Sequence, residues 1–86
     1  MEGFVYIALA SNNSYYVGST TDVIKRIAEH NSGKTKSLAN KLPIKLVFFQ
    51  KYRDIKKARQ IEYKLKRFKS RKIIDQIILD GIIEIN

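Results

Sequence analysis

Apolar and polar positions change their period along the chain, and three segments have the pattern of strands. Phe4–Leu9 is a short run of β-forming residues, and Tyr15–Ser19 follows it after a polar turn, so the two predict a hairpin. Ile44–Tyr52 predicts a third strand with apolar residues on both faces. Simple alternation assigns Leu46 and Phe48 to one face and Val47 and Phe49 to the other.

Three further segments have helical spacing, and each follows a residue that can cap a helix N-terminus. They cover residues 23–30, 55–69 and 71–80, with Thr21 or Asp22, Asp54 and Ser70 as the respective caps. Asn31 or Gly33 supplies a left-handed residue that ends the first helix. The core stripe predicted for the second helix consists of Ala58, Ile61, Leu65 and Phe68. Residues 34–43 predict a basic loop, and residues 82–85 a short tail strand or a docked extension.

The predicted order, ββαβαα, indicates a small α+β fold in which helices flank a three-stranded, mainly antiparallel sheet. Because the chain has 86 residues, we expect residues 1–86 to form a single domain. It contains no cysteine, which excludes disulfides, thiol catalysis and cysteine-based zinc sites. Its longest apolar run is too short to span a bilayer and no signal peptide pattern is present, so we expect a cytoplasmic protein that does not enter membranes.

Positive charge is concentrated in one part of the chain. The sequence has 17 basic and 8 acidic residues, and residues 51–72 hold 11 of the basic but only 2 of the acidic ones. Such a concentration favours a polyanionic partner, with nucleic acid as the first candidate. The alternative is a helix face that lysine keeps solvated.

Glu62 does not fit a purely structural pattern. It lies four residues after Ala58 and three before Leu65, so it projects close to the apolar stripe of its helix. A carboxylate there is costly unless it is paired. A salt bridge to a neighbouring lysine or arginine would satisfy it. A hard divalent cation would also do so, since Mg²⁺ commonly takes one or two protein carboxylates and completes its shell with water and phosphate.

Four more residues can carry chemistry. Arg26 and His30 lie four apart on one face of the first helix, at the edge of its buried side. An arginine suits a bidentate phosphate contact, and a histidine can exchange a proton or cap the helix C-terminus. Tyr6 and Tyr16 lie in the two hairpin strands. Such a pair usually belongs to the core. Alternatively, a phenol whose pKa is lowered by nearby cations can act as a proton acceptor.

Together these residues resemble the GIY-YIG nuclease family. Phe4-Val5-Tyr6 is similar to the family's first motif and Tyr16-Val17-Gly18 to its second. Arg26 matches the arginine of the family's first helix and is followed by His30-Asn31, while Glu62 matches its metal-binding glutamate. The resemblance extends over almost the whole chain. Many larger members also have an asparagine about a dozen residues after the glutamate, where this chain has Ile73-Ile74-Asp75-Gln76.

The resemblance implies an enzyme that hydrolyses phosphodiester bonds in DNA with one divalent cation, Mg²⁺ or Mn²⁺. Glu62 would hold the cation and Arg26 would neutralise the phosphate. Tyr6 is the candidate base that deprotonates water, with Tyr16 and His30 orienting it or sharing the proton. The sequence does not decide among these three residues.

Basic side chains would follow the DNA backbone and give affinity with little sequence specificity. They are Lys25, Lys34, Lys36, Lys64, Lys66 and Arg67. The chain is too short for a separate recognition domain, so high specificity would require a homodimer or a protein partner. Two other classes stay open: a non-catalytic nucleic-acid-binding module with the same fold, and a basic protein that binds structured RNA.

Overall fold

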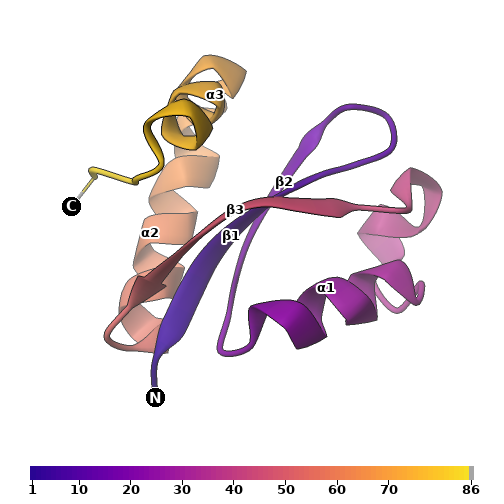
Figure 1. Ribbon diagram of the computed structural model, residues 1–86, viewed down its shortest axis with the longest axis horizontal. Helices are drawn as coiled ribbons and strands as arrows, with labels where there is room; N and C mark the ends of the chain where they lie inside the picture. Colours follow the sequence, from indigo (N-terminus) through magenta and orange to yellow (C-terminus); the bar gives the residue numbers. More distant parts are fainter. Residues whose placement is uncertain (86) are drawn as a thin grey trace.

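A computed structural model describes residues 1–85 of the chain. Three strands, β1 (Gly3–Leu9), β2 (Tyr15–Thr20) and β3 (Lys45–Tyr52), form an antiparallel sheet in the order β2-β1-β3 (Figure 1). The helices are α1 (Val23–Asn31), α2 (Ile55–Phe68) and α3 (Arg71–Asp80), and a short 3₁₀ helix, η1 (Lys36–Lys41), precedes β3. The predicted α+β fold of order ββαβαα is confirmed.

The three long helices begin at polar caps, as the sequence predicts. Side-chain oxygens accept a hydrogen bond from a backbone amide three residues later at each cap. The pairs are Asp22 with Lys25, Asp54 with Lys57, and Ser70 with Ile73. These caps fix where each helix starts, and therefore which residues of the helix face the sheet.

The sheet separates two apolar cores. Because side chains alternate along a strand, Val5 and Ile7 of β1 face α2 and α3, while Ala8 lies in the opposite core. The larger core is completed by Ala58, Ile61 and Leu65 of α2 and by Ile74, Ile77 and Ile83. The smaller core contains Ala8, Ala10, Leu38 and Ile44, packed against Tyr16 and Ile27.

The structure corrects one prediction for the helical half of the chain and decides between the two alternatives of another. Phe68 is 46% exposed and does not belong to the core stripe of α2. The chain turns at Lys69, and Ile74 of α3 takes the core position beyond Leu65. The tail after α3 is a docked extension and not a strand: Ile83 is buried, and its amide donates to the Gln50 side chain.

Two further predictions failed around β3. Its register with β1 shifts between Ile7 and Ala8, so Val47 and Phe48 both pack against the larger core, whereas Leu46 and Phe49 line the opposite face. A bulge of this kind breaks simple alternation. The expected basic loop at 34–43 contains η1, because buried Leu38 anchors it to the smaller core.

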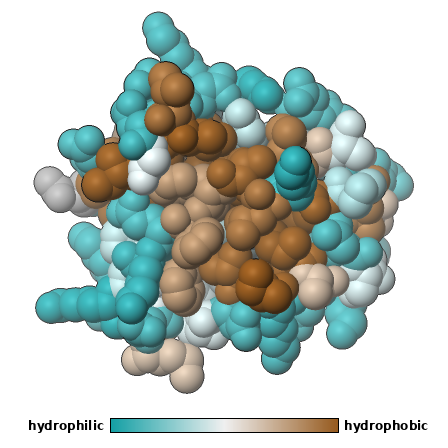
Figure 2. Space-filling model, viewed as in Figure 1, coloured by the Kyte–Doolittle hydropathy of each residue, from teal (hydrophilic) through white to brown (hydrophobic). Residues whose placement is uncertain are grey.

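The face of the molecule seen in Figure 1 carries a band of apolar side chains, visible in Figure 2. Ile24 of α1, which is 77% exposed, lines a pocket together with Phe4 and Phe49. These residues are separate from the polar cluster at the edge of β2. No helix within residues 1–85 has the length and apolar character that crossing a membrane requires.

Candidate active site

Tyr6 reaches the edge of the sheet because its partner in the next strand is a glycine. Tyr6 of β1 lies opposite Gly18 of β2, and its phenol covers the space that a side chain at 18 would fill. A Cβ at Gly18 would lie 2.5 Å from Cζ of Tyr6, far inside van der Waals contact. The glycine therefore allows the tyrosine ring to cross the edge strand.

The Tyr6 hydroxyl forms a buried hydrogen-bonded chain with α1. Its oxygen lies 2.8 Å from Nε2 of His30, and Nδ1 of His30 lies 2.5 Å from the Thr35 hydroxyl. His30 is fully buried and Tyr6 is 1% exposed. A neutral His30 that carries its proton on Nδ1 satisfies both contacts, since Nδ1 donates to Thr35 and Nε2 accepts from Tyr6.

The electrostatic surroundings keep this pair neutral near pH 7. Burial raises the pKa of Tyr6 to about 12; neighbouring Tyr16 adds to the shift and Arg26 opposes it. Burial also lowers the pKa of His30 below its ordinary value of 6.5, and the charge of Arg26 lowers it further. His30 is therefore neutral near pH 7, and its Nε2 lies within hydrogen-bond distance of the Tyr6 hydroxyl.

Asn31 and Thr35 hold His30 in place, and neither role was predicted from the sequence. Asn31, one of the two candidates for the left-handed residue, is helical; its amide side chain bonds both the amide and the carbonyl of Ile44, at 2.8 and 3.1 Å. This pair of bonds ties the end of α1 to the chain that leads into β3. Gly33 supplies the left-handed residue, with φ of +86°. Thr35 then closes over the imidazole, and only its position five residues after His30 could have suggested this role.

Tyr16 lies between the buried pair and solvent. Its ring is 6.2 Å from that of Tyr6 and 5.1 Å from that of His30, centroid to centroid. The Lys66 ammonium lies 5.9 Å from the centroid of the Tyr16 ring. Tyr16 is half-buried, so among the two predicted tyrosines it is the one that solvent reaches more easily.

Glu62 of α2 approaches the same edge from the opposite face of the sheet. The Ser19 hydroxyl donates to its Oε1, and the Lys66 ammonium pairs with its Oε2 at 2.7 Å. The salt bridge to a neighbouring lysine, considered above, is therefore present. Ser19 was missed by the sequence reading, although alternation from Val17 already directs it towards α2.

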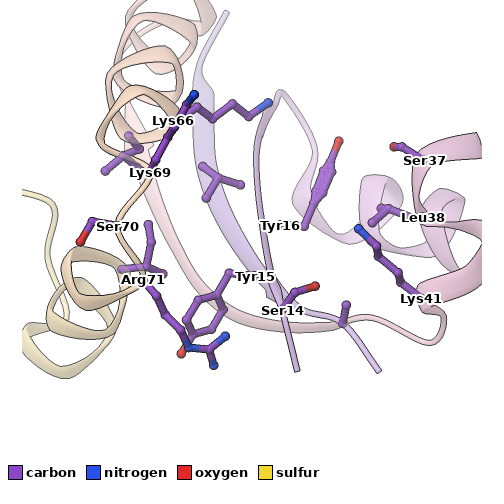
Figure 3. Close-up of a pocket in the computed structure, with 14 residues that line it drawn as sticks. Ser14, Tyr15, Tyr16, Ser37, Leu38, Lys41, Lys66, Lys69, Ser70 and Arg71 are labelled. Atoms are coloured by element: carbon purple, nitrogen blue, oxygen red, sulfur yellow. The ribbon is translucent and has the colours of Figure 1, made fainter. Parts of the chain in front are cut away.

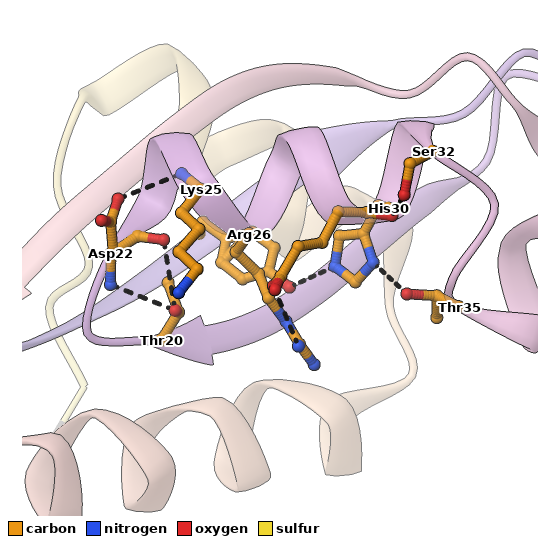
Figure 4. Close-up of polar contacts among 9 residues, drawn as sticks. Thr20, Asp22, Lys25, Arg26, His30, Ser32 and Thr35 are labelled. Carbon is orange, nitrogen blue, oxygen red and sulfur yellow. Dashed lines mark hydrogen bonds and ion pairs between the residues drawn. The ribbon is translucent and has the colours of Figure 1, made fainter.

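Arg26 completes the cluster from α1. Its guanidinium lies 3.6 Å from Glu29, and its side chain is 44% exposed (Figure 4). It is close enough to Tyr6 to counteract the rise in the tyrosine's pKa, and the charge of Glu62 acts on the same tyrosine. The structure thus brings Tyr6, Tyr16, Arg26, His30 and Glu62 together at one edge of the sheet. The two residues predicted at the edge of the buried side of α1 differ in exposure, since His30 is wholly buried and Arg26 is partly exposed.

The donor set around Glu62 fits a hard divalent cation held by few protein ligands. Within residues 1–85, no three His, Cys, Asp or Glu side chains form a metal-binding group. A carboxylate that is 20% exposed and a neighbouring hydroxyl oxygen from Ser19 suit a Mg²⁺ or Mn²⁺ ion whose other ligands are water and phosphate. The partner on Oε2, Lys66, is 53% exposed and can move away at low cost.

The residues at the position of the family's asparagine are engaged elsewhere. Asp75 accepts a hydrogen bond of 2.6 Å from the Tyr15 hydroxyl, and Gln76 donates to Asp80 at 2.8 Å. Neither contact leads towards Glu62. Neither side chain is therefore paired with Glu62.

The predicted nucleic-acid-binding residues separate into two groups. Lys66 contacts both Glu62 and Tyr16, and Lys34 and Lys36 flank Thr35. By contrast, Lys64 and Arg67 lie two and five residues from Glu62 and so occupy other faces of α2, where Arg67 stacks on exposed Tyr63 at 5.6 Å. Lys25 is exposed in the first turn of α1 (Figure 4).

The α+β fold, with a tyrosine–histidine pair, an arginine and a glutamate at one edge of its sheet, has the features expected of a small nuclease domain. The chain belongs to the GIY-YIG family: the family model described as the GIY-YIG catalytic domain matches residues 2–73. The resemblance seen in the sequence is thereby confirmed.

The relatives are small proteins of one group. A UPF0213 protein of Listeria monocytogenes serotype 4b is 40% identical over 79 residues, which cover 91% of this chain and 88% of the relative. The UPF0213 protein YazA of Bacillus subtilis is 34% identical over 70 residues, covering 80% and 71%. The solution NMR structure of a UPF0213 protein from Bacillus halodurans is 36% identical, with a TM-score of 0.60 over 94% of this chain and 87% of that one.

Proposed function

We propose that this protein is an endonuclease that hydrolyses phosphodiester bonds in DNA with one divalent cation, Mg²⁺ or Mn²⁺, and with little sequence specificity. The observation that carries this proposal is the meeting of Tyr6, Arg26 and Glu62, from β1, α1 and α2, at the edge of β2. Membership of a nuclease family supports the same reaction.

Tyr6 is the proposed base, with His30 as its proton acceptor. A phenol with a pKa of about 12 holds its proton at neutral pH, so it cannot act alone as a base. The hydrogen bond to neutral His30 provides the solution, because Tyr6 can pass its own proton to Nε2 while it takes one from water. The Nδ1 contact to Thr35 keeps Nε2 free to accept it. Tyr16 is the alternative base.

Arg26 and Glu62 act on the charge of the phosphate. The Arg26 guanidinium can bind two phosphate oxygens, and it neutralises the charge that grows in the transition state. Glu62, oriented by Ser19, would hold the divalent cation. When bound, such a cation supplies positive charge to the leaving oxygen. Release of Lys66 from Glu62 would then give the substrate a further cation.

A plasmid nicking assay tests the proposal. Wild type, Glu62→Gln and Glu84→Gln are compared with Mg²⁺, with Mn²⁺ and with EDTA; Glu84 is an exposed carboxylate outside the cluster and serves as the matched control. We expect nicking by wild type and by Glu84→Gln only when metal is present, and a loss of at least about 100-fold in Glu62→Gln.

Two results would contradict the proposal. Salt-dependent binding of DNA without cleavage of plasmid, single-stranded or branched substrates would indicate a non-catalytic binding module. Tighter binding to structured RNA than to DNA in competition would indicate an RNA-binding protein.

The two tyrosine variants identify the base. Cleavage that persists in Tyr6→Phe but is lost in Tyr16→Phe would transfer the role of base to Tyr16.

A further inference from the structure

A groove of about 510 Å³ lies beside the candidate active site, between η1 and the junction of α2 and α3. Figure 3 shows Tyr16 projecting into it, with Lys41 of η1 on one side and, on the other, Lys66 of α2 and Lys69 just after that helix. Tyr15 and Arg71 lie at its far end. Tyr16 and Lys66 belong to both the groove and the site, so the groove is a continuation of the site along the outer edge of β2.

The groove has the charge of an anion-binding surface. Its lining includes four cationic side chains and no acidic one, together with the hydroxyls of Ser14, Ser37 and Ser70. Arg71 is held in place, because it donates to the Asn13 carbonyl at 2.6 Å and stacks on Tyr15 at 4.3 Å. Among residues 1–85, neither Lys41 nor Lys69 pairs with a carboxylate. Their charges are therefore available to a ligand.

Lys69 has an unusual backbone conformation for its residue type. It ends α2 in the left-handed region, with φ of 48° and ψ of 38°, where glycine is the favoured residue. A lysine here carries a conformational cost that glycine would avoid. A strained residue whose side chain lines a cationic groove suggests that the side chain is used.

We propose that this groove binds the nucleic-acid strand that carries the scissile phosphate, on one side of the cleavage point. The phosphates of that strand would pair with Lys41 and Lys69, while sugars and bases lie over the apolar floor and the rings of Tyr15 and Tyr16. A cationic groove with aromatic faces is an arrangement that follows a nucleic-acid backbone without reading its sequence. The inference rests on the proposed function and assigns the path of its substrate.

The assignment differs from what the basic composition of α2 suggested. If the strand follows the groove, Lys41 and Lys69 contribute to nucleic-acid binding, whereas Lys64 on the outer part of α2 does not. The two sets of lysines can be compared directly, because both are exposed or partly exposed and each can lose the same charge.

Binding is measured without divalent metal, in EDTA, by the fluorescence anisotropy of a short labelled oligonucleotide between about 50 and 200 mM KCl. The groove variant combines Lys41→Gln with Lys69→Gly, and the control combines Lys56→Gln with Lys64→Gln. Lys69→Gly removes the backbone strain along with the charge, so it is not expected to lower stability. A thermal melt followed by circular dichroism confirms that both variants fold.

Two lost phosphate contacts should reduce the slope of log K against log salt by about 1.4, at about 0.7 for each contact with a single strand. At about 0.1 M salt this corresponds to a roughly 10- to 30-fold loss of affinity. We expect this loss in the groove variant and near wild-type binding in the control. Equal losses in both, a loss confined to the control, or wild-type binding without salt dependence would each overturn the groove assignment.

The outcome is independent of catalysis. If the groove variant binds weakly but Glu62→Gln and wild type both fail to cleave, the groove stands and the proposed nuclease activity fails. If Glu62→Gln abolishes cleavage while the groove variant binds like wild type, the nuclease stands and the strand follows another path.

Discussion

Replacement of Gly18 by alanine tests how the site is built. The added Cβ would lie 2.5 Å from Cζ and 2.7 Å from Cε2 of Tyr6, and it would be closest of all to the Tyr6 oxygen. Tyr6 is 1% exposed and packed against Tyr16, so its ring has little freedom to withdraw. The variant must therefore displace the tyrosine or distort β2.

The expected cost has two parts. Overpacking of this kind typically destabilises by about 1–3 kcal/mol. Displacement of Tyr6 also breaks its 2.8 Å contact with His30, and a buried imidazole nitrogen left without a partner costs about 1–3 kcal/mol more. The sum, about 2–6 kcal/mol, is a large share of the stability of a domain of this size, which is on the order of 4–13 kcal/mol.

A double-mutant cycle with Tyr6→Leu separates the clash from other effects. Leucine lacks the ring atoms that alanine at position 18 would meet. In that background Gly18→Ala should be neutral or should stabilise by about 0.5–1 kcal/mol, because alanine loses less backbone entropy than glycine in a strand. Urea unfolding followed by circular dichroism gives the four free energies of unfolding. If alanine costs the same in both backgrounds, the contact with Tyr6 is not the reason for the glycine.

Three further predictions follow from the site. Ser19→Ala should weaken Mn²⁺ binding, measured by calorimetry, by about 10- to 100-fold, because it removes the hydroxyl that orients Glu62; unchanged affinity would exclude that role. Since the pKa of His30 is lowered, folding stability should be complete above the ordinary value of 6.5 and should fall as the pH drops below it, because the unfolded chain binds a proton that the buried imidazole does not; a His30→Gln variant should lose this part of the acid dependence, and an equal loss of stability with falling pH in both proteins, measured by urea unfolding, would contradict a buried neutral His30. Since the pKa of Tyr6 is raised from 10.0 to about 12, wild type should lose on the order of 3 kcal/mol of stability between these pH values relative to Tyr6→Phe, at about 1.4 kcal/mol for each pKa unit, and equal alkaline unfolding of the two proteins would refute it.

The helices and strands could be predicted from the sequence because the local signals agreed with the tertiary contacts. Asp22, Asp54 and Ser70 cap the helices where the pattern placed them, and alternation in β1 directs Val5 and Ile7 into the larger core. Agreement between local and tertiary preferences is what makes such predictions succeed.

Failures occurred where a tertiary contact overrode the local pattern. The bulge opposite Ile7 and Ala8 turned Val47 and Phe48 to the same side, and no period within β3 reports a shift in its pairing with β1. Asn31 is a residue that favours turns, but its two bonds to Ile44 keep it in the helix. The predicted roles of the site residues depend on their proximity in space. Tyr6 and His30, for example, are 24 residues apart in the chain, and nothing in that separation reveals their contact.

Because β2 is an edge strand, residues from both faces of the sheet can meet beside it and share one site. Tyr16 and Gly18 point to the side of α1 and accommodate the tyrosine–histidine pair, whereas Val17 and Ser19 point to the side of α2 and meet Glu62. In a central strand the neighbouring backbone would keep these two sets apart. At the edge they are separated only by the strand itself, which brings the tyrosine–histidine pair and the carboxylate to one place. A shift of β2 by one residue would exchange the two faces and separate this pair from the carboxylate, because side-chain direction alternates with every residue. The site therefore depends on the pairing of Tyr6 with Gly18 as much as on the chemistry of any one side chain.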